Sequence, residues 1–353
     1  DSPPPLSPHA PSNSPPPAVA VVGAKVVALA ASSTETTRHG FEHAMAHIVN
    51  PGDTLVFIHV TKRRKTWSVA SIQEFLATCG TRGVQSQVVE VPHGKKAPSL
   101  VRAAVNVGAS VIVVVSSAPA PDGTGRRRSF TEKLRGDLAD TVLHHSLVSV
   151  AITRRDIPMV SLSGASENPA GRLVAVATER LYADRVLRWV FHNVLRANDS
   201  LFFMLAVPLR VSPLSNPIIA KHGPGVQSIT AMMTSQNAPD EEELELLAAA
   251  SVYLGDWLKY ASSVQVSVIG VLVPGDPREN IPKACSEYRV PYLITGSGCL
   301  SSCINGLTGS VSTKLSHSSP CPVTIVRWNK NENPGVVKSV VGASTPSPRP
   351  PLV

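Results

Sequence analysis

The sequence predicts an α/β fold of two tandem domains, each built on a five-stranded parallel sheet with helices on both faces. Apolar stretches with the spacing of strands alternate along the chain with stretches that have the spacing of helices, which is the order that a parallel sheet requires. The run at 110–115 is almost entirely apolar and β-branched, as expected for a strand buried on both faces. The same order of elements then occurs a second time, which indicates an internal repeat.

The first repeat is expected to contain the strands 25–30, 54–60, 84–91, 110–115 and 148–153. The helices between them are expected at 35–49, 68–81, 97–107 and 130–145. In the first of these helices an apolar face recurs at helical spacing, so it is expected to pack on the sheet. That face is formed by Phe41, Ala44, Met45 and Ile48.

The second repeat follows the same plan, with strands expected at 172–177, 200–207, 264–270, 292–295 and 323–327. Its helices are expected at 181–196, 240–261, 276–288 and 309–317. Between its second strand and second helix lies a long polar insertion that contains prolines, and a loop of that length is unusual in a compact domain. We therefore expect one domain at 19–156 and a second at 170–330 that carries an insertion near 208–239.

The two ends of the chain differ from the body in composition. Residues 1–18 are rich in proline and serine, and residues 331–353 in proline, serine and valine, so we expect disordered tails at both ends. The chain of 353 residues is 43% hydrophobic and has a formal net charge of +8. Its apolar runs are too short for a membrane span. Its odd number of cysteines, 5, favours reduced thiols and a cytoplasmic location.

A segment of the second repeat has the features of an anion site. A predicted strand ends in a glycine-containing loop, and that loop leads into the start of a predicted helix. Unpaired backbone N–H groups and the helix dipole favour an anion at such a helix start. The candidate cofactor-binding residues are Gly296, Ser297, Gly298, Gly309, Ser310 and Ser312.

This segment resembles the C-terminal part of the universal stress protein family, in which a glycine, two residues, a glycine, nine residues and a Gly-Ser or Gly-Thr pair hold the phosphates of ATP. The resemblance covers roughly 25–155 and 170–328. It implies two flavodoxin/Rossmann-like domains that pair through their last strands, either as an internal pseudo-dimer or as a homodimer with a second chain. It also implies ATP or AMP as the ligand of a nucleotide-binding member.

The chain departs from the family pattern where that pattern contacts the nucleotide. The aspartate that contacts adenosine in such members is Ala30 in the first repeat and Ala177 in the second, and a methyl group accepts no hydrogen bond. Asp137 and Asp140 stand at the first repeat's helix start, where a carboxylate would repel a triphosphate. A motif glycine of the second repeat is Cys299. We therefore expect no bound cofactor, with ATP or AMP in the second domain as the alternative.

Positive charge is concentrated in two clusters of the first repeat, one after the second predicted strand and one in the long loop before the fourth helix. Such clusters favour docking to the acidic surface of a protein partner. Aromatic residues that could stack on bases, such as Trp67, are not interleaved with these clusters, so nucleic acid is not expected as a partner, and neither is a membrane. The candidate partner-binding residues are Lys62, Arg63, Arg64, Lys65, Arg126, Arg127 and Arg128.

Four residues near the C-terminus are of types that can bind a metal ion. Cys299, Cys303, His317 and Cys321 have a spacing that formally resembles a zinc finger. The predicted fold argues against zinc, because it puts Cys321 at the start of the last strand and His317 at the end of the preceding helix. A zinc-binding module is therefore a third hypothesis, and no metal ligand is assigned.

Three histidines, His39, His43 and His47, recur every four residues along the first predicted helix. This spacing puts them on one face of the helix. No neighbouring carboxylate or cysteine completes a metal site in the sequence, so we expect an exposed polar stripe.

The motifs of catalysis are missing from the sequence, including the serine–histidine–aspartate order, the nucleophile elbow and the Walker loop. We therefore expect no enzymatic activity. The leading interpretation is a non-enzymatic interaction or structural module of a larger protein assembly, with the cytoskeleton as one setting, that docks through its basic face. The alternative is an adenine-nucleotide sensor that uses the second domain only.

Overall fold

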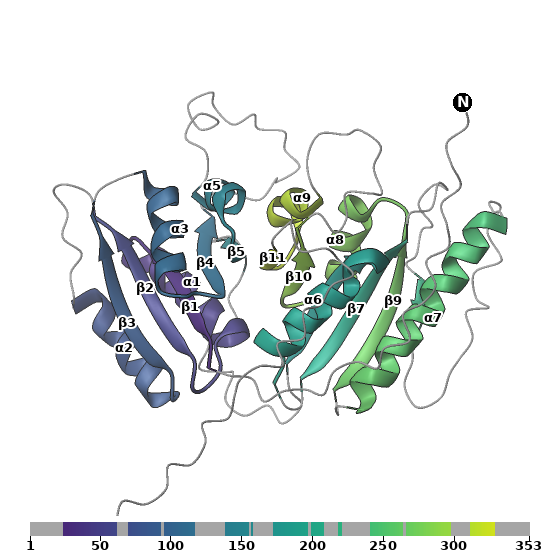
Figure 1. Cartoon of the computed structure of the whole chain (residues 1–353), viewed down its shortest axis with the longest axis horizontal. Helices are drawn as coiled ribbons and strands as arrows, with labels where there is room; N and C mark the ends of the chain where they lie inside the picture. The colour runs from purple at the N-terminus through teal and green to yellow at the C-terminus, as the bar shows by residue number, and fades with distance from the viewer. Residues whose placement is uncertain are drawn as a thin grey trace, which may run out of the picture.

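The structure is a computed structural model of the chain. It describes residues 24–61, 70–92, 95–116, 138–154, 157, 172–196, 199–207, 218–220, 241–263, 266–297 and 311–328. These residues form one large, mostly parallel sheet with helices packed against it (Figure 1). No helix within them is both long and apolar enough to cross a membrane.

The first half begins with β1 (Val26–Ala31), a buried strand followed by α1 (Thr34–His43). Ser33 caps α1 by accepting a hydrogen bond from the backbone N–H of Thr36, 3.3 Å away. A Cβ atom on Gly40 would lie 2.7 Å from Leu29, so the glycine lets α1 pack closely on the sheet. The remaining elements are β2 (Thr54–Val60), α2 (Ala70–Thr81), β3 (Gln85–Val91), α3 (Lys96–Asn106), β4 (Val111–Ser116), α5 (Leu138–His145) and β5 (Ser149–Arg154).

The second half repeats this order. Its helix α8 (Pro277–Glu287) has proline in its first turn and is capped by Asp276, which accepts from the backbone N–H of Arg278 at 2.9 Å. The other elements are β6 (Leu173–Glu179), α6 (Arg180–Asn193), β7 (Ser200–Val207), β8 (Ile218–Ala220), α7 (Glu241–Ser263), β9 (Ser267–Pro274), β10 (Leu293–Gly296), α9 (Val311–Ser318) and β11 (Val323–Val326).

The strands lie in the order β3-β2-β1-β4-β5-β11-β10-β6-β7-β9-β8. Each half contributes the same parallel arrangement: β1 lies between β2 and β4, and β6 lies between β7 and β10. The two halves meet where β5 and β11, the last strand of each, pair antiparallel with Ile152 opposite Val323. Figure 1 shows α5 and α9 close together above this pair. The predicted fold class and the internal pseudo-dimer are confirmed, whereas the domain boundaries stay predictions.

Three elements differ from the sequence prediction. The strand predicted at 264–270 is β9 (Ser267–Pro274), which begins three residues later and ends four residues later. The predicted helix at 35–49 is α1 followed by η1 (Ala44–Ile48), a single π-helical stretch. The insertion near 208–239 contributes β8, a short edge strand that pairs antiparallel with β9, with Ile218 opposite Leu272. A strand of three residues carries too little periodicity to be recognised in the sequence.

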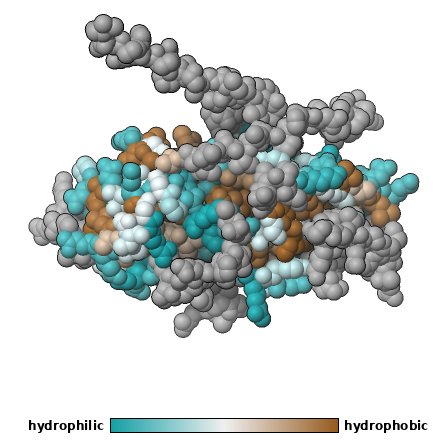
Figure 2. All heavy atoms as spheres, turned by 90° about the horizontal axis from the view of Figure 1, so that it is seen from below, coloured by the Kyte–Doolittle hydropathy of each residue, from teal (hydrophilic) through white to brown (hydrophobic). Residues whose placement is uncertain are grey.

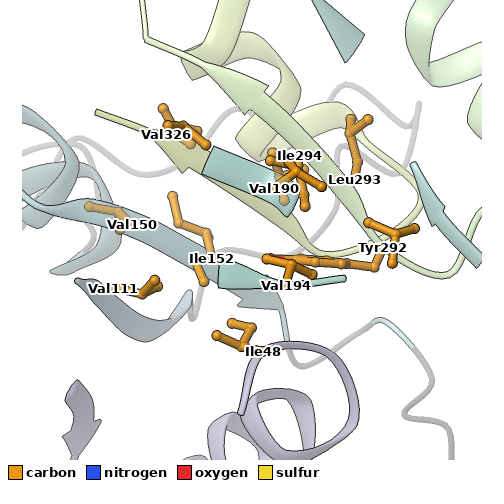
Figure 3. Close-up of a cluster of buried hydrophobic side chains, with 14 of the residues drawn as sticks. Ile48, Val111, Val150, Ile152, Val190, Val194, Tyr292, Leu293, Ile294 and Val326 are labelled. Atoms are coloured by element: carbon orange, nitrogen blue, oxygen red, sulfur yellow. The ribbon is translucent and has the colours of Figure 1, made fainter. Parts of the chain in front are cut away.

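The interior is continuous across the boundary between the halves. Ile48, Val111, Val150 and Ile152 of the first half lie near Val190, Val194, Tyr292, Leu293, Ile294 and Val326 of the second in Figure 3. All of these side chains are buried. Burial of apolar surface on both sides of β5 and β11 stabilises the joint between the halves.

The exposed large apolar side chains are scattered over several elements. They are Val88 in β3, Val105 in α3, Leu147 after α5, Leu244, Leu246 and Val252 in α7, and Ile269 in β9. Hydrophobic and hydrophilic residues are also interspersed on the face that Figure 2 shows. Scattered exposed apolar residues are normal for a protein surface, so they do not mark a docking site.

Candidate functional site

The candidate nucleotide site lies at the carboxyl ends of β6 and β10, where the strand order of the second half reverses. Ligands of open α/β sheets bind at such a switch point. The backbone N–H of Ser297 donates to the carbonyl of Val326 at 2.8 Å, and the hydroxyl of Ser312 donates to the carbonyl of Gly296 at 2.9 Å. The structure thus brings Gly296, Ser297 and Ser312 together, with the start of α9 held against the end of β10.

The other three predicted residues of this site, Gly298, Gly309 and Ser310, lie outside the described residues. So does Asp137 of the first half. Of the loop that joins β10 to α9, the structure therefore describes only the two ends. At those ends the Ser312 hydroxyl already has an acceptor inside the protein.

The adenosine side of the site carries a carboxylate at a different position from the family pattern. Ala177, near the end of β6, is fully buried. Two positions later Glu179, the residue before α6, is only 7% exposed. Sequence comparison with the family pattern missed Glu179 because it occupies the place of a serine. Its negative charge would oppose a phosphate and would suit a hydroxyl or amino group.

In the first half the corresponding helix start takes part in the contact between the halves. Asp140, in the first turn of α5, forms an ion pair with His317, in the last turn of α9, with Oδ1 and Nε2 2.8 Å apart. A carboxylate at a helix start complements the helix dipole, and the contact is an ion pair when His317 is protonated. The carboxylate of Asp140 thus stands in the first turn of α5, and its partner comes from the second half.

Two arginines at the ends of the last strands strengthen this contact. Arg154, at the end of β5, donates from Nη1 to the carbonyl of His317. Arg327, directly after β11, donates from Nη2 to the carbonyl of Leu143, and its backbone N–H donates to Ser149 Oγ at 3.2 Å. Each arginine therefore satisfies a carbonyl at the end of the other half's last helix, where carbonyls lack partners within the helix.

At the opposite, amino edge of the sheet, Arg172 connects the halves from the start of β6. Its Nη1 donates to the carbonyls of Ala46 and His47 in η1, at 3.1 Å and 3.0 Å. Its Nε and Nη2 donate to the two carboxylate oxygens of Asp199 at 3.1 Å and 2.5 Å, and Asp199 is almost fully buried. Such a bidentate pair fixes the guanidinium in one orientation.

Arg196 extends this cluster. Its backbone N–H donates to Asp199 at 2.8 Å, and its side chain donates to the carbonyl of Val49 and to the side-chain oxygen of Asn50 in the first half. Burial, together with the positive charge of Arg172, lowers the pKa of Arg196 to about 10. The guanidinium still stays charged at neutral pH, so the cluster keeps its charge-assisted hydrogen bonds.

The first half has a smaller version of this cluster. The Lys25 ammonium lies 2.5 Å from Asp53, whose carboxylate also accepts from the backbone N–H groups of Lys25 and Asn50 at 3.0 Å and 2.7 Å. Burial lowers the pKa of Lys25, and Asp53 acts in the opposite direction. This pair joins the starts of β1 and β2 within the first half.

The expectation of an exposed histidine stripe is wrong, because His39 and His47 are half-buried and His43 is buried. His43 is fully buried, and its ring lies 5.3 Å from that of Tyr292 in the second half. His47 stacks on the same tyrosine at 5.2 Å, while the Tyr292 hydroxyl pairs with Thr324. Burial lowers the pKa of His43 well below its usual range and that of His47 to about 4. The second half covers this helix face, which one repeat's periodicity cannot show.

The zinc hypothesis gains no support from the described residues. Cys299 and Cys303 lie outside them. His317 pairs with Asp140, and Cys321 is buried beside Ser319, with Sγ and Oγ 3.3 Å apart. No group of three or more histidine, cysteine or acidic side chains within the described part of the chain is arranged to hold a metal ion.

The two basic clusters also lie outside the described residues, namely Lys62–Lys65 and Arg126–Arg128. The nearest described positions show where the chain leaves the sheet towards them. The first cluster follows β2 and the second follows β4, so the chain departs in both cases from the carboxyl edge of parallel strands. Their role in docking stays a prediction.

The described elements define a tandem, doubly wound α/β protein with its candidate ligand site at the carboxyl ends of the second-half strands. Residues 171–327 match the model of the universal stress protein family, so this part of the chain is similar to that family. No curated protein sequence matches the chain.

Solved structures extend the likeness in fold to both halves. A universal stress protein from Archaeoglobus fulgidus is 16% identical, covers 88% of this chain and 99% of its own, and has a TM-score of 0.51. A putative universal stress protein from Pseudomonas aeruginosa is 12% identical, with coverages of 87% and 93% and a TM-score of 0.47. A universal stress protein family protein from Arabidopsis thaliana with AMP bound is 16% identical, with coverages of 46% and 98% and a TM-score of 0.28.

Proposed function

We propose that the chain is a non-enzymatic interaction or structural module of a larger protein assembly, with the cytoskeleton as one setting, and that it works in the cytoplasm. The observation that supports this most directly is the ion pair of Asp140 and His317, 2.8 Å apart. In the first half a carboxylate stands at the helix start where a phosphate would bind, and it is engaged with the second half. A carboxylate that already contacts the second half is not available to a nucleotide.

The second half also has few groups that would bind a nucleotide. Ala177 supplies no hydrogen-bond acceptor, and the buried carboxylate of Glu179 would oppose a phosphate. The hydroxyl of Ser312 donates to Gly296 rather than towards a ligand. These contacts support a scaffold in which residues at the candidate ligand sites bind other parts of the protein instead of a ligand.

The docking partner in this proposal is a protein with an acidic surface. Most of the net charge of +8 falls in the first half, and both basic clusters follow strands whose carboxyl ends share one edge of the sheet. Charges that leave the same edge can act on one partner, and their attraction weakens as salt screens it. The interaction should therefore be sensitive to ionic strength.

Charge reversal tests the docking. A Lys62→Glu, Arg63→Glu, Arg64→Glu variant should lose the proteins that co-purify with the wild type at ordinary salt. The matched control is Arg102→Glu, Lys259→Glu, Lys283→Glu, which makes the same change in charge at exposed residues outside the clusters. The control should keep the partners. Loss in both variants, or no partner for the wild type, would contradict docking through the clusters.

A second candidate function, binding of ATP or AMP by the second half alone, is favoured by one observation. The Ser312–Gly296 hydrogen bond holds the start of α9 at the switch point of the sheet, as a phosphate site requires. Gly309→Asp would place a carboxylate in that site and should abolish nucleotide binding measured by calorimetry. Gly136→Asp makes the same change at the corresponding position of the first repeat and serves as the control. Equal affinity in both variants would exclude the second-half site.

A further inference from the structure

Helix α6 carries three arginines whose side chains reach the surface of the second half. Arg180 is exposed, and Arg185 and Arg188 are half-buried, whereas Val186 and other apolar residues of the helix are buried against the sheet. The helix contains a single acidic residue, Asp184. α6 therefore presents a net positive charge to solvent.

Aromatic rings support two of these arginines. The guanidinium carbon of Arg180 lies 5.8 Å from the centre of the Tyr253 ring in α7. That of Arg185 lies 5.8 Å from the centre of the Trp328 ring, which follows β11 and stacks on Tyr182 of α6. A guanidinium that lies over a ring keeps N–H groups at its edge for an anion, because the cation–π contact uses its face. The rings thus hold these arginines in place without neutralising their charge.

The one carboxylate of α6 is engaged by other donors. Asp184 Oδ1 accepts hydrogen bonds from the Tyr253 hydroxyl at 2.5 Å and from the Trp257 indole N–H at 3.1 Å. Within the described part of the chain, Arg180 and Arg188 form no ion pair with a carboxylate. Their guanidinium groups therefore have no anionic partner on this protein surface.

The corresponding helix of the first half differs in this respect. Arg38 of α1 also lies over an aromatic ring, that of Phe75 in α2, with 5.5 Å between the guanidinium carbon and the ring centre. Its two Nη groups donate to the carboxylate oxygens of Glu74 at 3.1 Å and 2.9 Å. The first half thus supplies a carboxylate for its own arginine, whereas α6 leaves that place to another molecule.

We propose that the α6 surface, formed by Arg180, Arg185 and Arg188, is a docking site for an acidic segment of a protein partner. A guanidinium can bind a carboxylate through two parallel hydrogen bonds, and arginine clusters recognise acidic segments in this way. Arg180 and Arg188 are eight residues apart, or about 12 Å along the helix, so the partner needs carboxylates spread over that distance. The proposal rests on the proposed docking function for its class of partner and adds a contact on the second half.

Fluorescence anisotropy with a labelled decaglutamate peptide tests this surface. The full chain should bind the peptide saturably at low salt, and an Arg180→Gln, Arg188→Gln chain should bind it about tenfold more weakly. Arg82→Gln, Arg102→Gln is the matched control, because it removes the same charge at exposed arginines outside α6 and should keep the wild-type affinity. Equal losses in the two variants, or no saturable binding by the wild type, overturn the proposal.

A third variant separates this surface from the basic clusters of the first half. A Lys62→Glu, Arg63→Glu, Arg64→Glu chain should still bind decaglutamate, and should lose affinity when the two α6 substitutions are added. Loss of binding in that chain alone, with the α6 variant unchanged, overturns the α6 site and leaves docking through the clusters intact. A labelled oligothymidylate of matched charge should bind more weakly than the peptide. Equal or tighter binding that the α6 substitutions weaken overturns the assignment of a protein partner.

Discussion

The two halves share one strand order but use equivalent polar residues in different ways. At the start of β1, Lys25 pairs with Asp53 and stays within the first half. At the start of β6, Arg172 pairs with Asp199 and also reaches two carbonyls of η1 in the other half. Arginine presents several donors in a fixed plane, whereas lysine presents a single ammonium group. The repeat therefore keeps the position of the pair, and the second half adds the contact that joins the two.

The carboxyl edge differs from the amino edge in this respect. There Arg154 and Arg327 make equivalent contacts, each with a carbonyl of the opposite half. The ion pair of Asp140 and His317 has no such equivalent in the sequence, because Thr313 stands in the second repeat where Asp140 stands in the first. The joint thus combines a symmetric part, inherited from the repeat, with asymmetric additions.

The largest expected effect is that of Asp199→Ala. It would leave Arg172 and Arg196 without their buried carboxylate, and breaking a buried ion pair costs about 3–5 kcal/mol. Urea unfolding would measure the loss. The control is Asp256→Ala, which removes an exposed pair with Lys259 and should cost at most about 0.5 kcal/mol. Similar losses in both variants would show that the buried cluster does not hold the joint.

Arg172→Lys sharpens the comparison between the halves by giving β6 the residue that β1 has. Lysine has fewer hydrogen-bond donors than arginine, so the variant should lose the bonds to Ala46 and His47. We expect this to lower the unfolding free energy by about 2 kcal/mol. Arg278→Lys is the control, because Arg278 pairs with Asp276 within the same helix start. We predict that Arg278→Lys loses less unfolding free energy than Arg172→Lys in the same urea experiment. Equal losses would mean that the contact across the halves contributes nothing measurable.

The buried histidines give the joint a pH dependence. Burial, then the charges of Arg172 and Arg196, lower the pKa of His47 from 6.5 to about 4, so between these values the unfolded chain binds more protons. Stability should therefore fall as the pH decreases through this window. His47→Phe keeps a ring against Tyr292 without titrating, and should reduce the loss between pH 7 and pH 5 by about 2 kcal/mol. An unchanged pH slope of the unfolding free energy would contradict the buried position of His47.

The smallest expected effect is that of Asp140→Asn at the carboxyl edge. Its ion pair with His317 is partly exposed, so its removal should cost about 0.5 kcal/mol. Asp184→Asn is a suitable comparison, because that carboxylate serves only contacts within the second half, with Tyr253 and Trp257. Differential scanning calorimetry should show the two halves of the Asp140→Asn chain still melting together. Two separate transitions would mean that this pair, rather than the cluster of Arg172, holds the halves in one unit.

Much of the fold was predictable from the sequence because each predicted strand and helix has its own period. The valine run of β4 predicts a strand buried on both faces, and all of its residues are buried. The pairing of β5 with β11 followed from the family resemblance rather than from any property of Val150 or Ile325. Among the described residues, β8 and η1 were missed, since each is too short to show a period, and β9 was placed three to four residues too early.

The contacts between the halves were less predictable. His43 and His47 have polar side chains at helical spacing, which indicates an exposed face until Tyr292 of the other half is placed on it. Arg172 looks like any charged residue before a strand, and its bonds to η1 depend on how the halves are arranged. At the candidate site, Glu179 and the Ser312–Gly296 bond also required the structure, because they involve positions outside the family pattern or far apart in sequence.

Calorimetric titration of the full chain with MgATP and with AMP tests most directly the claim that the fold serves as a scaffold rather than as a nucleotide site. The engaged Asp140, the buried Glu179 and the methyl group of Ala177 predict no saturable heat even at millimolar nucleotide. Micromolar binding at one site, lost in Gly309→Asp and kept in Gly136→Asp, would contradict that claim and make the second half a nucleotide sensor.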